Sequence, residues 1–206
     1  GNKKPSKNMR FRLEKVQQKT SKYLKQDEEI LQEIKNKNKT VYGHMNYINN
    51  ASGYPMHKNT EVKYYSLGED NYVDLIKELK KAKKYIFMEY FIIEEGQMWN
   101  GILEILEQKA KEGLDVRLMY DDMGCVSLLP YGYDKELEKK GIQCIAFNPF
   151  KPLLSLAMNN RDHRKITVID GHTGFTGGIN LADEYINVKE RFGHWKDTGV
   201  MLKGEG

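Results

Sequence analysis

The residues whose types and spacing best suit chemistry are His163 and Lys165, two positions apart in the run 163–170. If this run enters a β-strand, alternate side chains share one face, so the imidazole and the ammonium point the same way. Together they suit a phosphate, because the lysine neutralises non-bridging oxygens while the imidazole attacks phosphorus or donates a proton. The spacing therefore predicts phosphate chemistry at His163.

Asp170 ends the same expected strand, beside Gly171, and completes a His-x-Lys-x-x-x-x-Asp pattern. It falls on the opposite parity from His163, so simple alternation argues against contact with the same phosphate. We expect Asp170 to hold the turn or to serve an adjoining half-site. In a lysine-rich chain with five histidines, the pattern arises by chance in roughly a few per cent of such sequences, so it needs support from its context.

A glycine pair, Gly177 and Gly178, follows the next expected strand, with Asn180 shortly after it. Two glycines let backbone N–H groups approach a ligand, and Asn180 adds a side-chain donor. An ordinary glycine turn is the alternative. Arg164 either adds positive charge around an anionic group or is a solvated surface charge. These four residues form the predicted substrate-binding set.

Strands and helices, whose sequence patterns alternate along the chain, must position these residues. Strand patterns occur at 62–65, 85–93, 114–120, 142–147, 166–169, 174–176 and 198–203, and helix patterns at 68–84, 98–112, 135–140 and 181–185. This alternation predicts an α/β fold with a mixed, largely parallel β-sheet flanked by helices on both faces. The apolar run 150–158 before the motif either receives acyl chains or is ordinary buried surface.

Residues 1–60 differ in composition from the rest of the chain: they are polar and rich in Lys, Gln and Glu. One or two amphipathic helices are expected up to the Asn and Lys run at 36–39, followed by a loop over 41–60. The predicted organisation is therefore a helical and loop segment at 1–60 and a domain with one motif at 61–206.

Bulk composition sets wider limits. The chain of 206 residues is long enough for one α/β domain with an appendage, and its net charge of +4 demands no polyanionic partner. Cys125 and Cys144 lack metal or redox spacing and are expected to be free thiols of a reducing compartment. No stretch approaches the roughly 20 apolar residues of a membrane helix, so the chain as given is expected to be soluble.

The motif residues together resemble the His-Lys-Asp (HKD) motif of the phospholipase D superfamily: His163, Lys165 and Asp170, then Gly177, Gly178 and Asn180. Longer blocks resemble bacterial cardiolipin synthases in particular, at 88–93, 98–99, 113–117, 120–124, 147–149, 160–165 and 194–198. The resemblance runs from about residue 10 to the end of the chain.

The resemblance implies phosphodiester exchange in two steps without a metal or other cofactor. One motif histidine forms a phosphohistidine, and a second histidine from the other half of the site protonates the leaving alcohol; His163 is one of the two. In cardiolipin synthases both substrates are phosphatidylglycerol, and glycerol leaves. Asp197 occupies the place where this family supplies the carboxylate that holds the histidine ring; a surface aspartate at a strand start is the alternative.

The sequence departs from this family by carrying one motif where cardiolipin synthases carry two. One explanation is the N-terminal catalytic half of a longer protein, with residues 1–60 as the linker from membrane helices; Gly1 in place of Met favours a start further upstream. Another is a one-motif phosphodiesterase or nuclease that builds its site across a homodimer. The third is an inactive binding domain. Gly178 stands where many relatives have serine.

Intact His163, Lys165 and Asn180 argue against an inactive domain, and the modest net charge argues against a nuclease. The expected partners are phosphatidylglycerol or another anionic phospholipid headgroup, a membrane surface, and either the second HKD half or a second copy. The expected location is the bacterial cell membrane, with the catalytic domain on a soluble face.

Overall fold

The structure is a computed structural model that describes residues 7–149 and 161–205. The chain divides into two compact units, one formed by the residues up to Asn59 with the last residues of the chain, the other by Thr60–Gly204. The motif belongs to the second unit.

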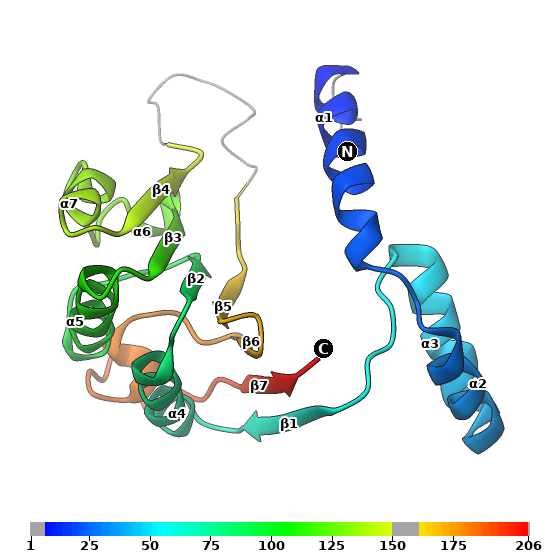
Figure 1. The fold of residues 1–206 in the computed structure, drawn as a ribbon. Helices are drawn as coiled ribbons and strands as arrows, with labels where there is room; N and C mark the ends of the chain where they lie inside the picture. The colour runs from blue at the N-terminus through cyan, green and yellow to red at the C-terminus, as the bar shows by residue number, and fades with distance from the viewer. Residues whose placement is uncertain (1–6, 150–160, 206) are drawn as a thin grey trace. The chain divides into compact units, whose positions relative to one another are not determined.

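One seven-stranded sheet organises the second unit (Figure 1). Its strands are β1 Thr60–Tyr65, β2 Tyr85–Tyr90, β3 Asp115–Asp121, β4 Gln143–Phe147, β5 Lys165–Ile169, β6 Thr173–Gly177 and β7 Gly199–Gly204. Their order across the sheet is β1-β7-β6-β5-β2-β3-β4. The predicted α/β class with a mixed sheet is confirmed.

The prediction that this sheet is largely parallel is wrong. Only β2 with β3 and β3 with β4 pair in parallel. The other four pairings are antiparallel, including β5 with β6 and β5 with β2. The reason lies in the connections, because a tight turn such as the one between β5 and β6 can join only antiparallel strands, whereas a parallel pair needs a long crossover.

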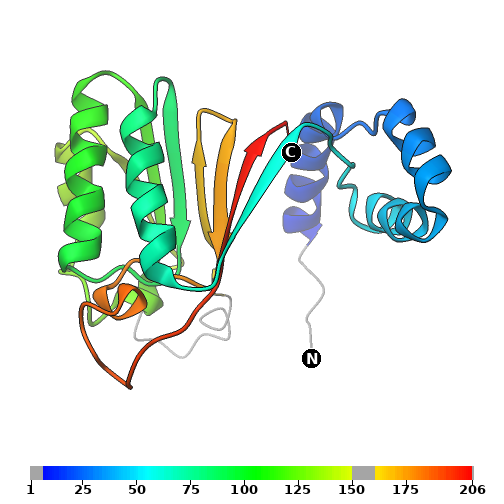
Figure 2. The ribbon, with the colours of Figure 1, turned by 90° about the horizontal axis from the view of Figure 1, so that it is seen from below.

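Helices of the described residues cover one face of this sheet, which corrects the prediction of helices on both faces. They are α4 Gly68–Lys81, α5 Gln97–Lys111 and α7 Tyr133–Lys139, with the short α6 Asp122–Cys125 and η3 Asp183–Ile186 at strand ends. Figures 1 and 2 show α4, α5 and α7 on the same side of the strands. Under them lie fully buried side chains such as Trp99, Ile102 and Leu106 of α5. On the opposite face a groove of about 680 Å³ follows β2 to β5 and is lined by Phe87, Glu89 and other side chains.

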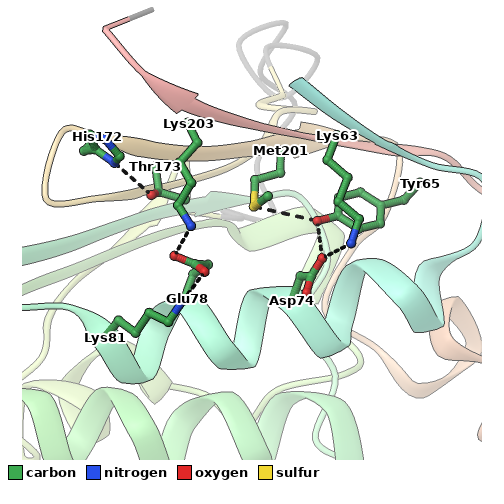
Figure 3. Close-up of polar contacts among 9 residues, drawn as sticks. All are labelled: Lys63, Tyr65, Asp74, Glu78, Lys81, His172, Thr173, Met201 and Lys203. Carbon is green, nitrogen blue, oxygen red and sulfur yellow. Dashed lines mark hydrogen bonds and ion pairs between the residues drawn. The ribbon is translucent and has the colours of Figure 1, made fainter. Parts of the chain in front are cut away.

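Paired charges join α4 to the two strands at one edge of the sheet (Figure 3). Asp74 of α4 accepts a hydrogen bond from Tyr65 Oη at 2.7 Å and forms an ion pair with Lys63 at 2.5 Å. One turn further, the buried Glu78 forms an ion pair with Lys203 of β7 at 2.8 Å. Burial and the Asp74 carboxylate raise the pKa of Tyr65, so its hydroxyl stays a donor. The edge strands are thus held through side chains as well as through the backbone.

The first unit contains α1 Lys7–Thr20, η1 Ser21–Tyr23, α2 Glu28–Lys37 and α3 Lys39–Ser52. The prediction of a loop over 41–60 is therefore wrong for its first part. Asn38 explains the difference, because its side chain accepts hydrogen bonds from the N–H groups of Thr40 and Val41 and starts a new helix where the Asn and Lys run was expected only to end one. Gly53, at φ 74°, ends that helix.

A small apolar cluster of Ile30, Leu31 and Met56 gives this unit its core. No helix among the described residues has both the length and the apolar character needed to cross a bilayer.

Candidate active site

His163 and Lys165 lie where three strands begin or end together. Lys165, the first residue of β5, pairs with Tyr90, the last residue of β2. Since β3 runs parallel to β2, its last residue, Asp121, reaches the same end of the sheet. His163 enters β5 from this end, so side chains from three strands converge on it.

Lys165 is buried, with 5% of its surface exposed, although it carries an ammonium group. Its Nζ donates to the His163 carbonyl oxygen at 2.8 Å and lies 5.3 Å from the centre of the Phe91 ring. Burial lowers the pKa of Lys165, while the negative charges of Asp197 and Asp162 oppose that shift. An ammonium has three donors, so Lys165 keeps hydrogen-bonding capacity for an anionic group.

His163 is exposed, and its ring packs against Phe91 with 4.6 Å between ring centres. Within the described part of the chain, no hydrogen bond reaches the imidazole. Phe91 therefore contacts both motif side chains, a role that the sequence analysis missed. The available signal was its place directly after β2, at the end of the apolar run 85–93.

Asp170 lies at the opposite end of β5 from His163, so the structure does not bring it to the phosphate side chains. Its carboxylate accepts the backbone N–H groups of Lys83, Lys84 and Tyr85 at 2.9, 2.7 and 3.0 Å. Burial opposes its charge, but these three donors outweigh that effect and hold the pKa of Asp170 below its ordinary value. Asp170 fastens the start of β2 to the turn after β5.

The glycine pair has its own structural task. The Gly178 N–H donates to the Thr198 carbonyl oxygen at 3.0 Å. A Cβ at Gly178 would lie 2.0 Å from Asp197 Oδ1, and one at Gly177, where φ is 152°, would lie 2.4 Å from the Thr198 oxygen. Both glycines therefore allow the segment that enters β7 to approach closely. Their predicted contact with a ligand stays a prediction.

Asn180 is buried and its amide is already engaged. Its Oδ1 accepts the Ile92 N–H at 3.0 Å, and its Nδ2 donates to the Tyr185 hydroxyl at 2.8 Å. These bonds join the segment after β6 to the segment after β2. Its predicted role as a donor to substrate also stays a prediction.

Asp197, the predicted partner of the histidine, is half-buried and accepts the N–H of Thr198 at 2.7 Å. Its charge acts on Lys165, which places it at the same end of the sheet. Among the residues that the structure describes, no hydrogen bond joins Asp197 to His163. Its orienting role stays a prediction.

Arg164 points away from the Lys165 side of the strand, as expected from alternation. Its Nε donates to Asp162 Oδ1 at 2.9 Å and lies 2.6 Å from Glu89 Oε1. The guanidinium thus has carboxylate partners within the protein, and its contact with substrate stays a prediction. Within the described ranges, no group of three His, Cys, Asp or Glu side chains is arranged to hold a metal ion. The apolar run 150–158 lies outside the described residues.

The sequence also matches a known family. Residues 75–191 match the family described as "Cardiolipin synthase, PLD-like domain", which is more than half of the chain. The fold and the motif define a phospholipase D-type domain. The chain belongs to the cardiolipin synthase PLD-like family, and the resemblance seen in the sequence is confirmed.

Several curated relatives are similar over most of this chain. An uncharacterized protein of Streptococcus mutans is 50% identical over 94% of this chain and 42% of its own length. Cardiolipin synthase 2 of Staphylococcus epidermidis is 42% identical over 70% of this chain and 30% of its own length. Cardiolipin synthase of Staphylococcus aureus is 41% identical over 70% of this chain and 29% of its own length. The chain thus spans less than half the length of these relatives.

Solved structures share the fold. NucT from Helicobacter pylori superposes with a TM-score of 0.53 at 14% identity, over 71% of this chain and 87% of that chain. The phospholipase D family member Nuc from Salmonella typhimurium gives 0.51 at 18% identity, over 71% and 83%. This likeness concerns the fold alone.

Proposed function

We propose that this chain supplies one half of the active site of a phosphatidyltransferase, which condenses two phosphatidylglycerols to cardiolipin and glycerol at the surface of a bacterial cell membrane. The observation that supports this most is the meeting of His163 with the buried ammonium of Lys165 at one end of β5. Family membership supports the choice of substrate. The second histidine comes from a second HKD half in the full-length protein or from a second copy.

The proposed reaction has two displacements at one phosphorus atom. His163 attacks the first phosphatidylglycerol, the bond from phosphorus to the headgroup glycerol breaks, and the second histidine gives that glycerol its proton. A hydroxyl of the second phosphatidylglycerol then returns a proton to that histidine and attacks phosphorus, and the phosphorus–nitrogen bond breaks. Lys165 neutralises the non-bridging oxygens in both steps. The roles of the two histidines could also be exchanged.

The test is a turnover assay of the full-length protein in vesicles that contain phosphatidylglycerol, with cardiolipin and glycerol measured together. His163→Ala should lower turnover by about 10⁴-fold or more, because a covalent route is removed. His172→Ala is the matched control, since His172 lies in the turn between β5 and β6, away from Lys165. It should retain activity within about twofold, as expected for a surface substitution.

Two results would overturn the proposal. One is hydrolysis of single-stranded DNA with no transfer between phosphatidylglycerol molecules, which would favour the homodimeric nuclease. The other is full transferase activity in His163→Ala. Trapping of a labelled phosphatidyl group on the wild-type protein but not on His163→Ala would add direct support for the phosphohistidine.

A further inference from the structure

The residues on either side of His163 are both fixed from the face of β5 that lies opposite Lys165. Asp162 is buried, and its backbone N–H donates to Asp121 Oδ2 at 2.8 Å. The Asp162 carboxylate in turn accepts hydrogen bonds from the backbone N–H of Arg164 at 3.3 Å and from its Nε at 2.9 Å. His163, by contrast, is exposed and packs on Phe91. Its position therefore depends on its neighbours.

Asp121 is a rigid anchor for this segment. It is fully buried at the end of β3, and its Oδ1 accepts the N–H groups of Met123 and Gly124 at 3.0 and 3.1 Å, which starts α6. The same oxygen lies 3.2 Å from Arg161 Nη1. One carboxylate thus ties β3, α6 and the two residues before His163 together.

Glu89 of β2 completes the arrangement from the groove face of the sheet. Glu89 Oε1 lies 2.6 Å from Arg164 Nε, but that N–H is directed at Asp162, so within the described residues Oε1 accepts no hydrogen bond. Burial and the facing carboxylate of Asp162 raise the pKa of Glu89 to about 7, while Arg164 opposes the shift. The pKa of Asp162 is lowered. The proton of this carboxyl pair therefore resides on Glu89.

Among the described residues, few charged groups face Glu89. Asp162 and Arg164 approach it from the start of β5. Its neighbours across the strands are apolar: Met119 on β3 and Ile166 on β5. Further along the same groove stand Arg117 of β3 and Glu138 of α7. Burial raises the pKa of Glu89 most, and the two neighbours of His163 are the charged groups that act on it.

We propose that Glu89 and Asp121 are positioning residues for His163: together they hold the backbone of Asp162 and Arg164 so that the imidazole is presented beside Lys165. This inference rests on the proposed function for its kinetic test but not for its structural one. In the protonated state, the Glu89 carboxyl donates to Asp162 and the two side chains attract. When Glu89 ionises, two carboxylates face each other with one guanidinium, and the segment loosens.

The consequence is a loss of turnover as the pH rises through about 7 in the wild-type protein. Glu89→Gln keeps an N–H donor toward Asp162 at every pH. In the full-length protein with phosphatidylglycerol vesicles, this variant should lack the decline near pH 7 or shift it upward by about one pH unit or more. Glu89→Ala should lower kcat at every pH. Glu89→Gln with a pH profile identical to that of the wild-type protein would overturn the proposal for Glu89.

Asp121 is tested by kcat and KM separately. Asp121→Asn should lower kcat by about 10- to 100-fold while KM changes little, because the histidine is misplaced and the lipid-binding surface is not. Asp115→Asn is the matched control, since Asp115 lies at the other end of β3 in an exposed pair with Arg117. Equal losses in both variants, or loss of the folded far-ultraviolet spectrum in Asp121→Asn alone, would overturn the positioning role.

A measurement without substrate separates this inference from the proposed function. Diethyl pyrocarbonate modifies exposed imidazoles, and mass spectrometry gives the rate at His163 and at His172 in the full-length protein. Glu89→Ala and Asp121→Asn should change the rate at His163 by at least about threefold and leave the rate at His172 as it is. Unchanged rates at both histidines would overturn the inference even if the transferase assay succeeds. Changed rates at His163 would support it even if phosphatidylglycerol is not the substrate.

Discussion

The two ends of β5 carry residues of one sequence motif, yet they are built in opposite ways. At the far end, Asp170 accepts three backbone N–H groups and fastens β2 to the turn. At the near end, the ammonium of Lys165 is buried with one hydrogen bond, and the His163 ring is exposed. The far end stabilises the fold, and the near end, where Lys165 makes one hydrogen bond, is where the proposed function places the phosphate. Residues of one motif therefore need not share one task.

The largest effect is expected from removing the cation of the near end. Lys165→Met should lower turnover by about 10³-fold, since one preorganised charge toward the phosphate is lost. The free energy of unfolding should stay equal or rise by about 1 kcal/mol, because a buried ammonium is replaced by an apolar chain of similar length. Turnover and urea unfolding measured on the same preparation check both parts. Lower stability together with full turnover would show that the lysine is structural.

The far end should respond in the opposite sense. Asp170→Ala leaves the N–H groups of Lys83, Lys84 and Tyr85 without their acceptor and places alanine at φ 56°. We expect the free energy of unfolding to fall by about 2–3 kcal/mol. Turnover per folded molecule should change little. If Asp170→Ala remained folded and lost as much turnover as Lys165→Met, Asp170 would have a role in catalysis and not only in the fold.

A smaller effect is expected at the glycine pair, which ends and follows β6 beside the near end of β5. In Gly178→Ser the new Cβ would meet the Asp197 carboxylate, so Asp197 must move away from its place near Lys165. We expect turnover to fall by about 10-fold, with a stability loss of about 1 kcal/mol. Kinetics and thermal unfolding measure the two effects. Higher turnover would mean instead that the serine hydroxyl restores a donor to phosphate that the glycine lacks.

Much of this architecture followed from local patterns. The apolar run 85–93 predicted β2, and the parity of the residues in the expected strand argued against a shared role for Asp170 and Lys165. Strand direction could not be predicted in the same way, since β5 lies next to β2 only through pairing between distant segments. The start of α3 at Asn38 could not be predicted either, because it depends on the orientation of one side chain, which accepts hydrogen bonds from the N–H groups of Thr40 and Val41.

In the candidate site, too, local features could be predicted and long-range contacts could not. The spacing of His163 and Lys165 was visible because it is local. The engagement of Asn180 with Ile92 and Tyr185 was not, because its partners lie in other segments. The same holds for Arg164, whose pairing with Glu89 joins β5 to β2 across the sheet. Residue type predicts what a side chain can do, while long-range packing decides whether that capacity is already used.

The smallest expected effect separates the charge of Asp170 from its hydrogen bonds. The pKa of Asp170 is lowered in the folded protein from an ordinary value of 3.8, so its charge stabilises the fold above that pH. The contribution is lost as the pH falls through the folded pKa. Asp170→Asn tolerates the positive φ and keeps an oxygen acceptor but has no charge to lose. Near pH 6 the wild-type protein should be more stable by about 1 kcal/mol in urea unfolding, and the difference should shrink below pH 3.8. A difference that stays constant with pH would mean that the three hydrogen bonds depend on side-chain shape rather than on charge, and that the two ends of β5 differ less in their electrostatics than in their geometry.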